Sequence, residues 1–165
     1  MVSVHGWQLF AHPRFLDQLE KLTVAVASAA KKDPAGFRKT ARAKLLVAVE
    51  KLAFDTIPED PARPEYRQGS TLGEGRKHWF RAKFGGGRFR LFFRYDGRAK
   101  VIVYAWINDQ DSLRTYGSKN DAYAVFRAML DKGDPPDKWE ALLDAARQAG
   151  AYTRIAKAAP KRRDK

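Results

Sequence analysis

The sequence contains no cysteine and only three histidines, His5, His12 and His78. The absence of cysteine excludes disulfides, thiolate metal ligands and thiol nucleophiles. The three histidines do not have the spacing of a helical metal pair. The sequence therefore predicts no metal site and no cofactor.

Long apolar segments are also absent. The longest run of small apolar residues, 24–30, is far too short to span a bilayer. The chain opens MVSVHGWQLF, which does not have the pattern of a secretory signal. We therefore expect a soluble, cytoplasmic protein without a membrane segment.

Acidic residues are few compared with basic ones. The chain has 32 Lys and Arg against 19 Asp and Glu, a formal net charge of +13. The last fifteen residues, AYTRIAKAAPKRRDK, carry +5 of this charge and offer little to pack, so we expect residues 151–165 to be a flexible basic tail after a domain of residues 1–150. The +8 that remains on the domain indicates binding to nucleic acid or to an acidic partner.

One stretch in the middle of the chain predicts three antiparallel strands. Aromatic and β-branched residues fill the segments 79–84, 88–95 and 100–107. A run of three glycines separates the first two segments, and Asp96-Gly97 separates the second from the third. The sequence therefore predicts an antiparallel meander.

The register of this meander decides where its charges lie. If residues 85 and 86 form a two-residue loop, Arg81 pairs with Arg90 and Lys83 with Arg88. A three-residue loop would instead place Arg90 beside Ala82 and separate the cations. We favour the first register, which gathers five cations on one face: Arg81, Lys83, Arg88, Arg90 and Arg94.

In that register the opposite face is an apolar wall. It consists of Phe80, Ala82, Phe84, Phe89, Leu91, Phe93, Tyr95, Ile102, Tyr104 and Trp106, while Val101, Val103 and Ala105 lie on the basic face. A rigid surface with five cations is most easily tolerated where a polyanion binds. A solvated strand face is the alternative interpretation.

Helices are expected before the meander. Residues 6–11 predict a short additional strand, and apolar residues at helical spacing predict a helix over 13–32. Asp33 as N-cap and Pro34 at the first helical position predict a second helix to about residue 55. Both helices have one apolar stripe, so we expect them to cover the apolar wall. Residues 56–76, rich in proline and glycine, predict a long connection.

Two more helices are expected after the meander. One covers residues 119–132 and ends at Gly133, and the other begins at Asp134 or Asp137 and ends at Gly150. The predicted fold class is therefore α+β. An antiparallel sheet, the meander plus an N-terminal strand, packs on N-terminal helices and is followed by two additional C-terminal helices.

Most standard catalytic patterns are missing. Asp109 and Asp111 lack the glycine and the further ligands of a calcium loop, which favours a turn, a cap or an ion pair with Arg114. We find no carboxylate cluster for two-metal hydrolysis and no nucleophile elbow. The basic face remains as the candidate site.

RNA is a substrate for which such residues suffice. Its own 2′-hydroxyl attacks the adjacent phosphate once a base removes the proton and cations stabilise the developing charge. Neighbouring cations favour the neutral form of an amine, which makes Lys83, among the arginines, a candidate base. Arg114 and Tyr116, shortly after the third strand, are further candidates, with loop packing as the alternative role.

Several segments resemble one family. They are GWQLFAHP, HWFRAKFGGGRFRLFFRY, VIVYAWINDQDSLRTYG, DAYAVFRAML and GDPPDKWE. Over residues 5–145 the sequence resembles the YhaV-type toxins of bacterial toxin–antitoxin pairs, which are members of the broader RelE-like ribonuclease superfamily. The resemblance implies a RelE-like fold and an endoribonuclease, or mRNA interferase. The implied enzyme cleaves mRNA without a metal, usually in the ribosomal A site, leaves a cyclic phosphate by 2′-hydroxyl attack, and so inhibits translation.

The resemblance also implies site residues and partners. The superfamily pattern of two basic residues two apart, then an arginine on the following strand, corresponds to Arg81, Lys83 and Arg90. The later arginine and tyrosine correspond to Arg114 and Tyr116, although the following helices depart from the short RelE-like ending. The implied partners are mRNA, the ribosome, a PrlF-type antitoxin with an AbrB-like domain and, through the complex, promoter DNA.

The expected roles can be stated residue by residue. Lys83 is a base or a transition-state cation, Arg81 and Arg90 stabilise the phosphate and the transition state, Arg114 contacts a phosphate, and Tyr116 stacks on a base or donates a proton. We expect further RNA contacts from His78, Arg88, Arg94 and Lys119. The alternatives are a non-catalytic module that binds RNA or the ribosome and a transcriptional co-repressor that depends on the antitoxin.

Overall fold

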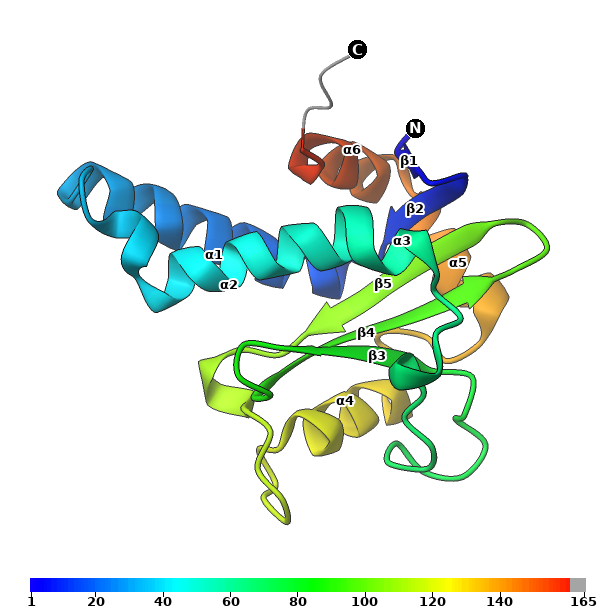
Figure 1. Cartoon of the computed structure of the whole chain (residues 1–165). Coiled ribbons are helices and arrows are strands. Elements are labelled where there is room, and N and C mark those ends of the chain that lie inside the picture. The colour runs from blue at the N-terminus through cyan, green and yellow to red at the C-terminus, as the bar shows by residue number, and fades with distance from the viewer. Residues whose placement is uncertain (161–165) are drawn as a thin grey trace.

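The computed structural model describes residues 1–160, and within them five strands form one sheet (Figure 1). The strands are β1 (Ser3–Val4), β2 (Trp7–Ala11), β3 (Phe80–Phe84), β4 (Phe89–Asp96) and β5 (Val101–Ile107). Their spatial order is β1-β2-β5-β4-β3. All neighbouring strands are antiparallel except β2 and β5, which are parallel. The predicted meander and N-terminal strand are confirmed, and the hairpin strand β1 is an addition.

The N-terminal helices cover one face of the sheet, as expected. Helix α1 (Pro13–Lys32) and helix α2 (Ala41–Lys51) pack there, and α2 continues through a π-helical turn, Leu52–Thr56, into α3 (Ile57–Glu59). Apolar side chains of the helices and of the meander form one buried core. This core includes Phe15, Leu16, Leu19, Val49, Ile57, Leu91, Phe93, Ile102 and Tyr104.

The other face of the sheet is covered as well. Helix α4 (Ala122–Asp131) and helix α5 (Trp139–Arg147) lie against it and form a second core. Its members include Trp79, Phe92, Val103, Trp106, Phe126 and Leu142. The expected open cationic plate is therefore confined to the end of the β3–β4 hairpin, because the helices bury the rest of that face.

The hairpin register differs from the favoured one by two residues. Lys83 pairs with Arg90 and Arg81 with Phe92, so residues 85–88 form the loop. All three glycines of this loop have positive φ, from 60° to 81°, a conformation that glycine adopts without steric cost. A shift by two residues preserves the alternation of faces. Arg81, Lys83, Arg90 and Arg94 therefore still share one face of the sheet.

Trp106 lies on the opposite face from the one expected. The β4–β5 register shifts between Phe92 and Phe93, so that Phe93 pairs with Tyr104 while Phe92 pairs with Trp106. Ala105 is thus an extra residue on β5, and such a β-bulge inverts the alternation beyond it. The indole of Trp106 consequently packs in the second core, with its ring centroid 5.8 Å from that of Phe126.

The second helix begins later than expected. Asp33 ends α1 as its C-cap, and its carboxylate accepts a hydrogen bond from the Gly36 N–H at 3.1 Å. This closes a local turn rather than a helix. After a 3₁₀ turn at Phe37–Lys39, Thr40 is the N-cap of α2, and its hydroxyl accepts from the Ala43 N–H at 3.3 Å.

The C-terminal segment contains a helix where a tail was expected. Helix α6 (Ala149–Ala158) includes Gly150, which therefore does not stop helical structure. Ala151 and Ile155 of α6 are buried in the first core, and Arg154 forms ion pairs with Asp17 and Glu20 of α1. Residues 161–165, the end of the expected tail, lie outside the described residues. No helix within residues 1–160 is long and apolar enough to cross a membrane.

The start of α1 depends on a neutral histidine. His12 is the N-cap, and its Nδ1 accepts a hydrogen bond from the Arg14 N–H at 3.1 Å. Burial lowers the pKa of His12 below its ordinary value of 6.5, although nearby Asp134 acts in the opposite direction. The unfolded chain therefore takes up this proton at a higher pH than the folded protein, and stability falls as the pH drops below about 6.5.

We predict that His12→Asn will flatten this part of the pH dependence, because asparagine caps a helix without titrating. Urea unfolding at pH 7.5 and pH 5.5 checks it. The loss of unfolding free energy on acidification should be smaller in the variant by about 1 kcal/mol, because one proton bound by the unfolded chain at one pH unit below its pKa contributes at most about 1.4 kcal/mol. An equal loss in both proteins would contradict the role of His12.

Candidate active site

Tyr123, the second residue of α4, holds two arginines of the hairpin. Its hydroxyl accepts hydrogen bonds from Nε of Arg81 at 2.8 Å and from Nε of Arg90 at 2.9 Å. Its ring packs edge-on against Phe92, which fixes the phenol beneath the strands. Within residues 1–160, neither arginine has a carboxylate within 4 Å. Two cations are thus gathered without being neutralised.

The two arginines differ in their access to solvent. Arg90 is only 5% exposed, and its Nη1 donates to the backbone carbonyls of Gly87 at 2.7 Å and Phe89 at 3.0 Å. Arg81 is half-buried, and its Nη1 donates to the carbonyl of Glu65 at 2.6 Å. Arg90 therefore orders the glycine loop from inside, whereas Arg81 presents charge at the surface.

Lys83 is the exposed cation of the group. It is directly opposite Arg90 in the strand register and two residues from Arg81 on the same face. Within the described part of the chain no carboxylate lies within 4 Å of its amine. The structure therefore brings together the three strand residues that the sequence analysis selected.

A loop after β5 adds Arg114 and Tyr116 to this group. The guanidinium of Arg114 lies over the ring of Tyr116 at 3.7 Å and over the ring of Tyr123 at 4.7 Å. Tyr116 is 86% exposed. The Arg114 N–H also donates to the carbonyl of Arg88 at 2.9 Å, which ties the loop to the hairpin.

Asp121 anchors this loop. Its carboxylate accepts from Nη1 of Arg114 and from the Thr115 N–H, both at 2.6 Å, and it caps α4 through the Tyr123 N–H at 3.0 Å. Burial alone would raise the pKa of this carboxyl, but the bonds from Arg114 and the two backbone groups outweigh burial and lower the pKa. Asp121 therefore stays ionised at neutral pH and keeps Arg114 beside Tyr123.

A surface hollow extends from this group along α4. Its volume is about 520 Å³, and its lining includes Arg114, Lys119, Arg127 and Tyr123 together with Asp121 and Asp131, whose carboxylates pair with Arg114 and Arg76. Lys119, expected to contact RNA, is exposed there. The cationic surface thus continues beyond the hairpin, in a direction that a nucleic-acid strand can follow.

Two of the expected RNA-contacting residues, His78 and Arg94, bind Asp137 of the protein itself. His78 Nε2 lies 3.0 Å from the carboxylate of Asp137, and Nη1 of Arg94 donates to the Asp137 carbonyl at 2.6 Å. The Arg94 guanidinium lies over the rings of Trp79 and Trp139, and its buried Nε has no hydrogen-bond partner. Arg88, in contrast, is exposed beside the glycine loop.

Two residues of the site were not selected from the sequence. Asp121 and Tyr123 lie at the start of α4, in the segment DAYAVFRAML. The spacing along the helix could have indicated that Tyr123 points toward the sheet, because Tyr123 precedes the inward-facing Phe126 by three residues and lies on the same side of the helix. Which polar groups its hydroxyl meets depends on how α4 docks on the sheet.

The acidic residues near the site serve structural roles. The Asp109 carboxylate accepts from the Asp111 N–H at 3.0 Å and from the Ser112 hydroxyl at 3.0 Å, which confirms the expected turn and cap. Arg114 pairs with Asp121 instead of with Asp109 or Asp111. Among residues 1–160 no three His, Asp or Glu side chains gather into a group that could hold a metal ion.

Comparison with known proteins gives one consistent result. Residues 9–147 match the YhaV toxin family, described as a toxin with endonuclease activity, of toxin-antitoxin system. The chain is 47% identical over 140 residues to the ribonuclease toxin YhaV of Escherichia coli K12 and to the toxin YhaV of Escherichia coli O6:H1. Each alignment covers 84% of this chain and 91% of the relative. No solved structure matches significantly.

The positions of Arg94 and Arg88 predict opposite effects of substitution. Arg94→Ala should lower the free energy of unfolding by about 2 kcal/mol, because it removes side-chain packing between two indoles, and should leave the RNA affinity of the folded protein unchanged. Arg88→Ala should weaken RNA binding severalfold without affecting stability. Urea unfolding and fluorescence anisotropy with labelled RNA measure both. The assignment is contradicted if Arg94→Ala behaves like Arg88→Ala in both measurements.

Proposed function

Because the chain belongs to the YhaV toxin family, toxins with endonuclease activity from toxin–antitoxin systems, we propose that it is a ribonuclease that cleaves RNA at the cationic group around Tyr123. The observation that carries this proposal is the convergence of Arg81 and Arg90 on one hydroxyl, with Lys83 opposite Arg90 in the strand register. A phosphodiester is the ligand that such unneutralised cations fit best.

The proposed chemistry uses the RNA's own nucleophile. Lys83 acts as the base that removes the proton of a 2′-hydroxyl, and the oxygen attacks the adjacent phosphorus. The bond from phosphorus to the 5′ oxygen then breaks, and that oxygen takes up a proton from water. The products are a 2′,3′-cyclic phosphate and a 5′-hydroxyl, and no metal takes part.

The remaining residues have separate roles in this scheme. Arg81 is accessible enough to bind the phosphate oxygens and stabilises the charge that develops on them. Arg114, whose side chain is 15% exposed and paired with Asp121, is an additional phosphate contact. Arg90 is a positioning residue, because its burial keeps it in contact with Tyr123 and the glycine loop instead of with solvent. One face of the exposed Tyr116 ring stacks on Arg114, and a nucleobase occupies the other.

The biological setting follows from the same proposal. A toxin–antitoxin system implies an antitoxin partner, and we propose a PrlF-type antitoxin with an AbrB-like domain, the pair binding its own promoter DNA. We further propose that the substrate is mRNA, cut mainly on the ribosome in the cytoplasm, so that translation is inhibited. The exposed cations on the hairpin and along the α4 hollow support contact with a second RNA surface as well as with the substrate.

Variants of the strand residues test the site. Arg81→Ala and Lys83→Ala should each slow cleavage by at least about 100-fold, the usual effect of removing one group that stabilises the transition state. Lys83→Arg should be equally slow, because arginine keeps the charge but cannot act as a base. Lys39→Ala, an exposed cation between α1 and α2, is the matched control and should cleave at the normal rate.

The assay uses folded proteins, RNA alone and translating ribosomes, with a chelator present. We expect cleavage on translating ribosomes that leaves a cyclic phosphate end. Full activity of Lys83→Arg would refute the role of Lys83 as base. Binding of RNA without any cut by the native chain would refute the enzyme and support a binding module.

A further inference from the structure

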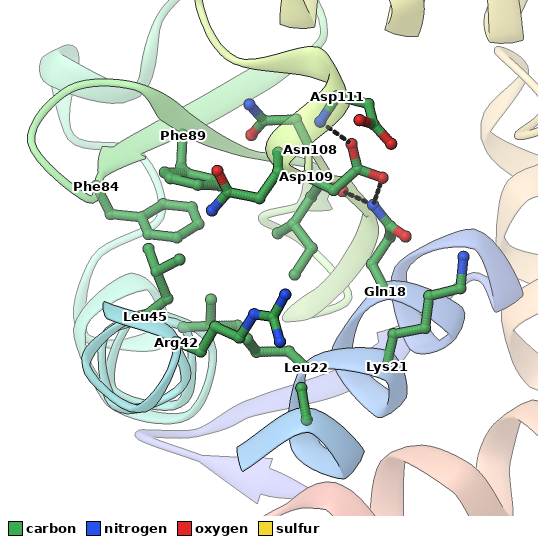
Figure 2. A pocket seen from close by; sticks show the side chains of 14 residues that line it. Gln18, Lys21, Leu22, Arg42, Leu45, Phe84, Phe89, Asn108, Asp109 and Asp111 are labelled. Atoms are coloured by element: carbon green, nitrogen blue, oxygen red, sulfur yellow. Dashed lines mark hydrogen bonds between the residues drawn. The ribbon is translucent and has the colours of Figure 1, made fainter. Parts of the chain in front are cut away.

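An apolar groove lies on the face of the sheet opposite to the cationic group. It opens between α1, α2 and the β3–β4 hairpin and has a volume of about 340 Å³ (Figure 2). Its floor consists of Leu22, Leu45, Val49, Phe84, Phe89 and Ile107. Phe84 and Phe89 are paired next to Lys83 and Arg90, so the groove is behind the same hairpin that presents the site. A groove of this composition accepts a large apolar side chain.

The rim of the groove is charged on two sides. Lys21 of α1 and Arg42 of α2 lie on one side, and Asp109 and Asp111 from the loop after β5 lie on the other. Figure 2 shows the guanidinium of Arg42 directed toward the open space. Within the described residues neither Lys21 nor Arg42 has a carboxylate within 4 Å, whereas Arg14 and Arg154, also on helices of this face, are both paired. These two cations are available to acidic groups of a partner.

One wall of the groove is ordered without a ligand. Nε2 of Gln18 donates to the Ile107 carbonyl at 3.0 Å and to the Asp109 carboxylate at 3.1 Å (Figure 2). Asp109 in turn accepts from the Asp111 N–H and the Ser112 hydroxyl. A preformed wall lowers the ordering cost of binding.

We propose that this groove is the docking site for a segment of the cognate antitoxin that inserts one large apolar side chain and places carboxylates beside Lys21 and Arg42. The proposal rests on the proposed function, because that function supplies the partner. An acidic segment also suits a chain with a net charge of +13.

Other occupants fit the groove less well. RNA would leave the apolar floor without a complement, because its charged backbone does not fill an apolar groove. A second copy of the chain would bring two strongly basic proteins together. A segment that is both apolar and acidic can pack an apolar side chain on the floor and pair its carboxylates with the unpaired rim cations.

Binding in this groove would contact the catalytic hairpin from behind. A Cβ added at Gly85 would lie 2.8 Å from Leu45 and 2.6 Å from Phe89, so the glycine loop packs tightly against the groove wall. The same loop receives the hydrogen bond of Arg90 at Gly87. An occupant that shifts Leu45 or Phe89 therefore acts on the segment that positions Arg90.

Two groove variants and two matched controls test this proposal. Ala25→Phe fills the groove from α1, and Ala27→Phe places the same ring two residues away, where the side chain is exposed and outside the groove. Arg42→Glu reverses the rim charge, and Lys44→Glu makes the same reversal at an exposed position of α2 outside the groove. The purified cognate antitoxin is the probe. We expect its Kd to rise at least about tenfold for each groove variant and to stay within about twofold for each control.

RNA cleavage without antitoxin separates this proposal from the proposed function. Arg42→Glu and the two controls should cleave RNA at the normal rate, and both groove variants should need more antitoxin for inhibition. Normal antitoxin affinity of both groove variants overturns the proposal, even if cleavage is as expected. A changed oligomeric state without a change in antitoxin affinity overturns it in favour of self-association. If Ala25→Phe does not fold, Arg42→Glu alone decides, because its side chain is exposed.

Discussion

The candidate site depends on one hydroxyl group that accepts hydrogen bonds from two arginines. Two guanidinium groups repel each other, and proteins usually hold such groups together with a carboxylate. Here the oxygen of Tyr123 accepts from Arg81 and Arg90, and neither has a carboxylate within 4 Å in residues 1–160. A neutral acceptor fixes their positions without neutralising them, so the charge of the more accessible Arg81 remains available to an anion. A carboxylate at this position would weaken phosphate binding.

The rest of the fold can be understood as support for this arrangement. The helices α1 and α2 bury one face of the sheet, while α4 and α5 bury most of the other. Within residues 1–160 the hairpin end of the second face stays accessible, and α4 brings Tyr123 and Asp121 to it. Asp121 then fixes Arg114, whose guanidinium stacks on Tyr116. Residues far apart in the sequence thus meet at one place because two cores hold their elements rigidly.

Much of this architecture was predictable from local patterns. The meander, the N-terminal strand and α1 follow from hydrophobic periodicity and from turn residues. The predicted loop length was wrong by two residues, but a shift of two residues preserves the alternation of faces, so Arg81, Lys83 and Arg90 still share one face. The position of Trp106 was not predictable, because a single extra residue, Ala105, reverses the pattern.

Tertiary packing accounts for the other differences. Arg94 looks like an exposed strand cation until α5 covers it, and the sequence does not reveal where that helix docks. Gly150 resembles a helix stop, yet α6 includes it because Ala151 and Ile155 gain a buried face against the first core. The role of Tyr123 also depends on tertiary packing, because its phenol contacts the arginines only after α4 packs on β4.

The role of the Tyr123 hydroxyl can be measured as the single-turnover cleavage rate of Tyr123→Phe at saturating RNA. Phenylalanine keeps the ring that packs on Phe92 and stacks on Arg114, and it removes only the oxygen that holds Arg81 and Arg90. We expect a folded protein that still binds RNA but cleaves it about tenfold to 100-fold more slowly, because Arg81 and the positioning residue Arg90 are no longer held in place. A folded variant that cleaves at the native rate would contradict this role.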